Sequence, residues 1–162
     1  MKIHRNLVTP AKPIAFDEDI DFSMRDYGPA YPLLGLKEVH ASGEFYLSDE
    51  GLRCAAKVHC VATLSDARTC EPFEECFDFE DDCGLPTSPE EDAEGYLFEG
   101  NVIELDELIY CLIHTQLPMC PRKGGSPLPR SGEGYTVYSE DDLMEEEKSS
   151  PFDALKDYKF ED

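Results

Sequence analysis

The chain has 162 residues, of which 41% are hydrophobic, and it carries a formal net charge of −22 with a sequence pI of about 4.3. This composition suffices for one domain with a modest core and excludes global disorder. The acidic charge argues against binding of nucleic-acid phosphates, which requires Lys and Arg, and no Lys or Arg occurs between Arg68 and Arg122. A basic protein partner fits this surface better.

The first third of the chain predicts one short strand and one long irregular segment. Residues Lys2–Val8 read as an opening strand. Residues 9–36 are rich in proline and are expected to form an irregular segment. Four apolar residues would anchor that segment to a core, namely Ile14, Phe16, Ile20 and Phe22.

The clearest β signal is a hairpin between Val39 and Leu64 with its turn at Ser48–Gly51. Side chains alternate between the two faces of a strand, so every second residue of the second strand should face the core. The predicted core set is Leu52, Cys54, Ala56, Val58, Cys60, Ala62 and Leu64.

A further strand is expected at Pro72–Asp82, then an acidic loop, then a strand at Tyr96–Leu105. A helix follows at Asp106–Leu117, with Asp106 as its N-cap and an apolar stripe at helical spacing. The sequence thus predicts an α+β fold, with an antiparallel sheet or partly open barrel of about five strands packed on one main helix.

The chain divides by composition into a domain at 1–120, a flexible loop at 121–149 and a segment at 150–162 that docks on the domain. Residues 150–160 should form a short C-terminal helix, with Pro151 in its first turn. No apolar run reaches the ~20 residues of a membrane span, and the N-terminus has no signal-peptide core. We therefore expect a cytoplasmic protein whose seven cysteines are reduced and mostly serve as small packing residues.

Three tests for chemistry give negative results. Asp78, Glu80 and Asp82 occupy the first ligand positions of an EF-hand pattern, but Cys83 replaces the required glycine and Pro89 the required glutamate. Cys70 is followed by acidic residues that disfavour a thiolate. The glycines after Lys123 lack the strand and helix of a phosphate-binding loop. The expectation is no enzyme and no cofactor.

The order of elements nevertheless resembles a known family. A strand–turn–strand leads into a turn of the form R-x-x-E-P-F, followed by an acidic strand, the helix IELDELIYCLIHTQLP and the tail SPFDALKDYKF. This set resembles the YceD family, also called large ribosomal RNA subunit accumulation proteins. Candidate partner-binding positions are those that match its turn and tail, namely Arg68, Glu71, Pro72, Phe73, Pro151, Phe152, Leu155 and Lys156.

Members of this family carry cysteine pairs that look suited to a structural zinc ion, and this sequence departs from them. Asp66 and Thr69 stand at two of the cysteine positions and Ser126 at another, so that at most Cys120 is kept. A structural zinc takes about four thiolate or imidazole ligands. We predict no zinc site, and a loop after Pro118 that is floppier than in relatives with the cysteines.

The resemblance implies a role in accumulation, processing or stability of 23S ribosomal RNA. The leading hypothesis is a non-catalytic accessory factor that binds a basic ribosomal protein or assembly factor. A second hypothesis is direct RNA binding through basic residues near the chain ends, namely Lys2, Arg5, Lys12, Arg122, Lys123 and Arg130. A third is a thiol-dependent enzyme that uses Cys70.

Overall fold

A computed structural model describes residues 1–28, 32–88, 95–98, 100–124, 128 and 131–138. By its internal contacts the chain divides into two compact units, Met1–Lys123 and Gly124–Asp162. The first unit holds all the named helices and strands. In the described part of the second unit, Gly132 and Tyr135 form an isolated antiparallel bridge.

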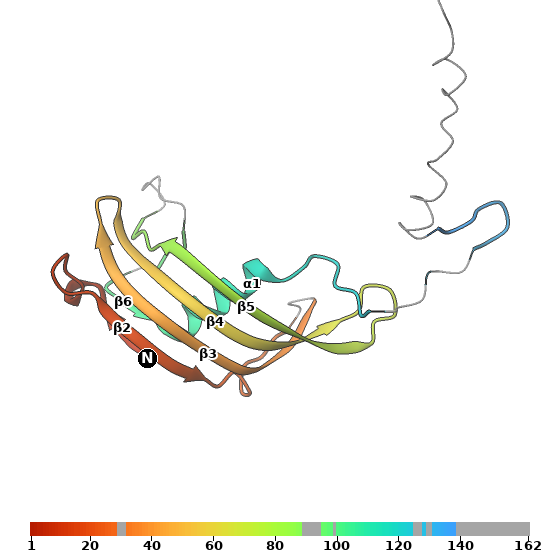
Figure 1. The fold of residues 1–162 in the computed structure, drawn as a ribbon, viewed down its shortest axis with the longest axis horizontal. Coiled ribbons are helices and arrows are strands. Elements are labelled where there is room, and N and C mark those ends of the chain that lie inside the picture. The colour runs from red at the N-terminus through yellow and green to blue at the C-terminus, as the bar shows by residue number, and fades with distance from the viewer. Residues whose placement is uncertain (29–31, 89–94, 99, 125–127, 129–130, 139–162) are drawn as a thin grey trace, which may run out of the picture. The chain divides into compact units, whose positions relative to one another are not determined.

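The first unit is built on a four-stranded antiparallel sheet with strand order β2-β3-β4-β5 (Figure 1). Its strands are β2 (Ile14–Ile20), β3 (Leu33–Ser48), β4 (Gly51–Ser65) and β5 (Pro72–Gly84). Strands β3 and β4 form the predicted hairpin, and the pair Ser48 and Gly51 closes its turn. The expected strand at Pro72–Asp82 is confirmed as β5.

A second, two-stranded sheet pairs β1 (Lys2–His4) with β6 (Val102–Glu104). A short 3-10 helix, η1 (Arg5–Leu7), follows β1, and α1 (Leu105–Gln116) follows β6. The predicted helix is confirmed to within one residue at each end. Asp106 is not its N-cap, however, because Glu104 holds that position and Asp106 lies in the first turn, where it contacts the N-terminal amine of Met1.

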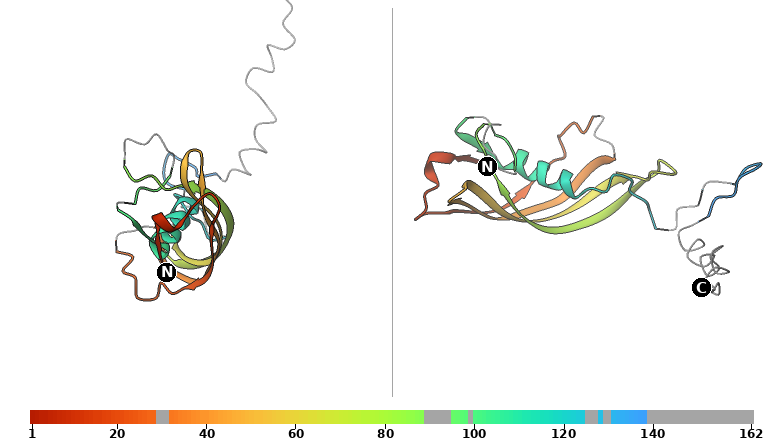
Figure 2. Two further views of the ribbon diagram at one scale, coloured as in Figure 1. Left: turned by 90° about the vertical axis from the view of Figure 1, so that its left-hand side faces the viewer. Right: turned by 90° about the horizontal axis from the view of Figure 1, so that it is seen from above.

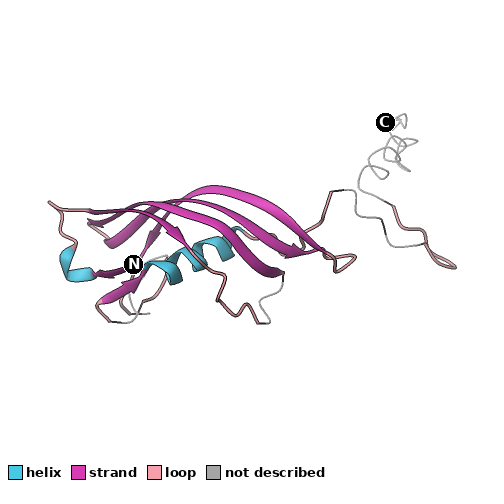
Figure 3. Ribbon diagram, turned by 90° about the horizontal axis from the view of Figure 1, so that it is seen from below, coloured by secondary structure: helices cyan, strands magenta, loops and turns pink. Residues whose placement is uncertain are grey.

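One hydrophobic core unites the inner face of the four-stranded sheet, α1 and the small sheet. Six of the seven predicted core residues of β4 are buried, and Leu52 is partly buried against them. The buried residues of α1 are its apolar stripe, namely Leu105, Leu108, Ile109, Leu112 and Ile113. The sheet curls around one side of α1, which lies beneath its concave face (Figures 2 and 3). The convex face is therefore the outer one.

The predicted α+β class is wrong. Strands make up 50% and helices 12% of the described residues, so the protein is mostly β. The sheet of about five strands is also wrong, because six strands divide between two antiparallel sheets. The expected strands at Tyr96–Leu105 and Lys2–Val8 are shorter in the structure, where they are β6 and β1. These two strands pair with each other, and both end where that pairing ends.

The segment 9–36 is not irregular throughout, because it contains β2 and the start of β3. Strand β2 packs Ile14, Phe16 and Ile20 against the core and pairs along its whole length with β3. The predicted C-terminal helix at 150–160 lies outside the described residues, as does most of the predicted loop at 121–149.

Candidate functional site

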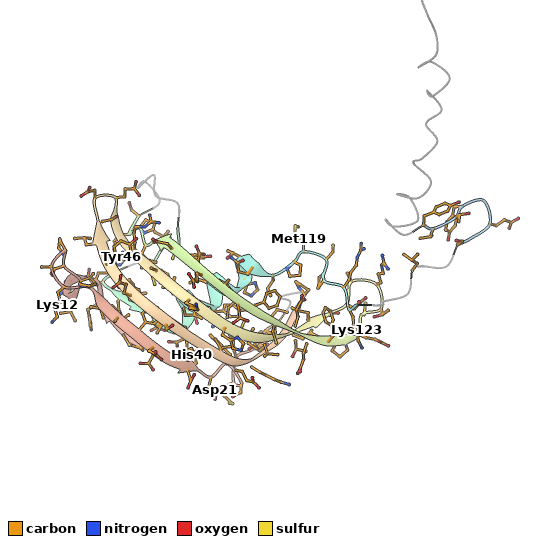
Figure 4. All side chains as sticks on the ribbon, viewed as in Figure 1. Lys12, Asp21, His40, Tyr46, Met119 and Lys123 are labelled. Atoms are coloured by element: carbon orange, nitrogen blue, oxygen red, sulfur yellow. The ribbon has the colours of Figure 1, made fainter. Side chains whose placement is uncertain are left out.

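The outer face of the four-stranded sheet is an exposed acidic surface. The register puts alternate residues of each strand on this face, because partners in adjacent strands point to the same side. Seven carboxylates of this face are exposed, namely Asp17, Asp19, Glu44, Glu74, Asp78, Glu80 and Asp82. Figure 4 shows side chains standing out along the convex side of the strands, with His40 and Tyr46 labelled on β3.

The cations of this face are already paired with carboxylates. Lys57 Nζ lies 2.8 Å from Glu80 Oε1, and Lys37 Nζ lies 2.6 Å from Glu74 Oε1. Arg53 donates to the Asp82 carboxylate at 2.9 Å and to its backbone carbonyl at 2.9 Å. The carboxylates therefore outnumber the cations, and a net negative charge remains.

A shallow depression lies in the middle of this face. Its floor consists of small residues, namely Ala15, Ser42, Gly43 and Ala55. Glu44, Glu80 and Asp82 line it together with Lys57. Because the floor residues lack long side chains, a partner's side chain can reach the sheet there while its charge stays near carboxylates. A second depression, around His40 and His59, shares Ser42, Lys57 and Glu80 with the first.

A row of four titratable side chains crosses the sheet beside these depressions. His40 and His59 are directly opposite each other on β3 and β4. His40 Nδ1 lies 2.8 Å from Asp19 Oδ1 on β2, and His59 Nδ1 lies 2.7 Å from Asp78 Oδ1 on β5. Both imidazoles are partly exposed. This row was not among the candidate sites expected from the sequence, although both histidines have the outward parity of the hairpin.

The turn between β4 and β5 is organised by the Asp66 carboxylate, which is fully buried. Its Oδ1 accepts from the backbone N–H groups of Arg68 at 2.8 Å and Thr69 at 2.9 Å. Its Oδ2 accepts from the backbone N–H of Lys123 at 2.8 Å. The Ala67 N–H donates to the Pro121 carbonyl at 2.8 Å. The segment after Pro118 is thus anchored at these residues by a hydrogen-bonded carboxylate.

The candidate partner-binding residues do not form one described surface. Arg68 and Glu71 lie in the turn, Pro72 begins β5, and Phe73 packs against the core opposite Leu64. Pro151, Phe152, Leu155 and Lys156 lie outside the described residues, as does Ser126. The docking of residues 150–162 on the domain stays a prediction.

The candidate RNA-binding residues are partly engaged within the protein. Lys2 pairs with Glu104, and the Arg5 guanidinium donates to the carbonyls of Leu85, Pro86 and Phe98. Lys12, Arg122 and Lys123 are exposed, and Arg130 lies outside the described residues. Two of the six positions thus have a structural task.

The cysteines divide between core and surface. Cys54, Cys60 and Cys83 are buried, and burial raises the pKa of the Cys60 and Cys83 thiols to about 11. Cys70 is exposed, and none of the hydrogen bonds among described residues joins it to a histidine. The EF-hand positions Asp78, Glu80 and Asp82 lie on a strand, each beside a partner on β4.

Cys70 has a φ of 58°, in the left-handed region that costs an L-residue of order 1 kcal/mol. Its N–H donates to the Asp66 carbonyl and so closes the turn. We expect Cys70→Gly to stabilise the protein by about 0.5 to 1 kcal/mol in urea unfolding. Ala67→Gly, at a neighbouring position without positive φ, should instead destabilise it by about 0.5 kcal/mol. Equal effects of the two changes would contradict this view of the turn.

In comparisons by sequence and by structure, no family model, no curated protein and no solved structure matches this chain. None of the helices in the described ranges has the length and apolar character that a membrane span requires.

Proposed function

We propose that this chain is a non-catalytic binding protein whose acidic outer sheet face holds a basic protein. The observation that carries the proposal is the depression over Gly43 and Ala55, which has small residues in its floor and carboxylates along its rim. A partner's Lys or Arg side chain placed there gains attraction from Glu44 and from the carboxylates that surround the paired cations. Such complementarity increases specificity and the rate of association.

The class of partner follows from the family resemblance. We propose a basic ribosomal protein or assembly factor of the large subunit, and with it a cytoplasmic role in accumulation, processing or stability of 23S ribosomal RNA. The support is the turn with Arg68, Glu71, Pro72 and Phe73, together with a charge of −22. An acidic protein can shield a basic ribosomal protein from other polyanions until that protein is incorporated.

Direct RNA binding is the less favoured alternative. It would require phosphate contacts from Lys12, Arg122 and Lys123, because Lys2 and Arg5 are engaged within the protein. These cations belong to a protein whose sheet presents carboxylates, which repel phosphates over a Debye length of ~8 Å at physiological salt. A thiol-dependent reaction at Cys70 has even less support, since no base is bound to that thiol among the described residues.

A binding series with purified large-subunit ribosomal proteins and a lysine-rich peptide tests the proposal. The wild type should bind at low salt, and affinity should fall as salt rises. Glu44→Lys reverses an exposed charge at the depression and should weaken binding about 10-fold, which corresponds to about 1.4 kcal/mol.

Asp49→Lys is the matched control, because it makes the same charge change in the hairpin turn. Asp49 lies five residues further along the chain from Glu44, about 17 Å away and beyond a Debye length. It should change affinity much less. Equal losses in the two variants would contradict binding at the outer face. If the lysine-rich peptide binds but none of the ribosomal proteins does, the proposal of a ribosomal partner is contradicted, while binding of basic chains at the outer face is not.

A further inference from the structure

Strand β5 lies at one edge of the four-stranded sheet, and its outer side pairs with no other strand among the described residues (Figure 1). An isolated bridge between Gly84 and Gly95 involves only the last residue of β5. At Asp82, the backbone carbonyl accepts from the Arg53 guanidinium. The stretch before Asp82 therefore forms an open edge, whose backbone groups are available to a further strand.

The register identifies the backbone groups that face this open edge. The Leu85 N–H donates to the Leu52 carbonyl at 2.8 Å, and the Asp66 N–H donates to the Glu71 carbonyl at 2.9 Å. Both bonds continue the register of β4 and β5, in which hydrogen-bonded pairs alternate with pairs that make no hydrogen bond. The odd-numbered residues of β5 therefore bond to β4. The residues whose N–H and carbonyl groups face the open edge are the even-numbered ones, namely Glu74, Cys76, Asp78 and Glu80.

The two faces of the sheet differ in chemistry along this edge. Three exposed carboxylates lie on the outer face, namely Glu74, Asp78 and Glu80. Three phenylalanines lie on the inner face and are only partly buried against the core, namely Phe73, Phe77 and Phe79. Side chains of opposite residues point to the same face of a sheet. A strand that fits both faces therefore alternates basic residues with apolar ones.

We propose that the open edge of β5 binds an extended basic segment of the partner as an added antiparallel strand. This inference rests on the proposed function, in which the partner is a basic protein, and it specifies how that partner is held. In such complexes, main-chain hydrogen bonds give affinity and alternate side chains give specificity. The basic side chains lie opposite the even-numbered residues. The apolar ones lie opposite the phenylalanines, in the pairs that bring side chains closest together.

Charge excludes a second copy of β5 as the added strand. Strand β5 contains no Lys or Arg, so two such edges would place carboxylates opposite carboxylates, which is destabilising. The cations that already contact these carboxylates come from β3 and β4, with Lys37 at Glu74 and Lys57 at Glu80. A carboxylate has about four acceptor positions. Its side toward the open edge can therefore accept from a lysine or arginine of the partner.

A synthetic peptide of about seven residues that alternates lysine with valine is long enough to span Glu74–Glu80. It should bind the whole chain at low salt and slow hydrogen exchange at the Cys76 and Asp78 amides. In an antiparallel pair the lysine N–H groups face β5, and the valine N–H groups face away from it. Methylation of the lysine backbone nitrogens should thus weaken binding about 10- to 100-fold. Methylation of the valine backbone nitrogens is the matched control and should change affinity much less.

Cys76→Pro tests the same hydrogen bonds from the side of the protein. Proline removes an N–H that β4 does not use, and an edge strand tolerates proline at such a position. We expect the affinity for the lysine–valine peptide to fall at least about 10-fold. Cys76→Ala removes the same exposed side chain but keeps the N–H, and should bind as the wild type does. Thermal unfolding of both variants checks that they are folded.

Two results would overturn strand addition. One is equal affinity of the two methylated peptides for the wild type, a comparison that does not depend on the folding of Cys76→Pro. The other is slow exchange of the Cys76 and Asp78 amides in the free protein, because another part of the chain or a second copy would then cover the edge. If Glu44→Lys weakens binding while the methylated peptides bind equally, only strand addition is contradicted, and binding at the outer face stands.

Discussion

Replacement of Asp66 by alanine is expected to destabilise the protein by about 3 kcal/mol. The change removes the fully buried Asp66 carboxylate, which accepts hydrogen bonds from the backbone N–H groups of Arg68, Thr69 and Lys123. Each lost hydrogen bond to a charged group costs about 1.5 to 3 kcal/mol, and partial access of water to the loosened turn offsets part of the sum. Urea unfolding at neutral pH measures the loss.

Asp66→Asn separates shape from charge at this position. An asparagine oxygen can still accept from Arg68 and Thr69, but its NH₂ group then faces the Lys123 N–H. We expect an intermediate loss and faster hydrogen exchange at the Lys123 amide. Asp49→Ala, in the exposed hairpin turn, should stay within about 0.5 kcal/mol of the wild type. An Asp66→Ala protein as stable as Asp49→Ala would show that the carboxylate does not hold the two segments together.

Gly43→Ala is expected to destabilise the protein by about 3 kcal/mol, at the upper end of the cost of overpacking. A Cβ at Gly43 would lie 2.1 Å from the Ala55 carbonyl oxygen and 3.0 Å from Ala56 Cα. Both contacts are with backbone atoms of β4, so β3 and β4 must move apart in the centre of the sheet. The same movement would deform the depression that Gly43 and Ala55 line.

Gly35→Ala is the matched control on the same strand. A Cβ there meets Thr63 atoms at 3.8 and 3.9 Å, which is ordinary van der Waals contact. We expect an effect within about 0.5 kcal/mol, by thermal or urea unfolding. Similar losses of stability in Gly43→Ala and Gly35→Ala would contradict this explanation, because only Gly43 has backbone atoms of β4 close to the added Cβ.

The hairpin, the strand β5 and the helix α1 could be predicted because their patterns are long and regular. The core parity of β4 holds from Cys54 to Leu64. Strand β2 was missed because Asp17, Glu18 and Asp19 follow one another, as in a loop, while the apolar residues lie two and four positions apart. That pattern suits an edge strand with one solvated face.

The start of β3 was missed for a different reason. The register shifts between Lys37 and His40, and Glu38 there has a φ of 51°. A second shift lies between Leu33 and Gly35. These bulges interrupt the alternation of faces, so Leu36 is buried like Leu33 and Val39 although it lies three residues from each. The alternation of buried and exposed residues therefore does not continue through the bulged part of β3. The α+β assignment then failed because β2 and the start of β3 add strand residues, while α1 is the one α-helix among the described residues.

The acidic sheet face could have been found from the sequence, and the Asp66 cluster could not. Counting outward from the turn at Ser48–Gly51 places His40 opposite His59, because the hairpin has no irregularity between the turn and that pair. Asp66, by contrast, was interpreted as the remnant of a metal position. Its contact with Lys123 joins segments far apart in the chain, which no local pattern reports.

The most direct test of binding at the outer face is a map of where a basic partner contacts the protein. Amide chemical shifts of the labelled protein, titrated with a lysine-rich peptide and with the ribosomal protein that binds best, locate the contact. Binding at the outer face predicts the largest changes at Ser42, Glu44, Ala55, Lys57 and Glu80, all reduced at higher salt. Changes confined to the turn at Ala67–Glu71, or to the small sheet of β1 and β6, would contradict it.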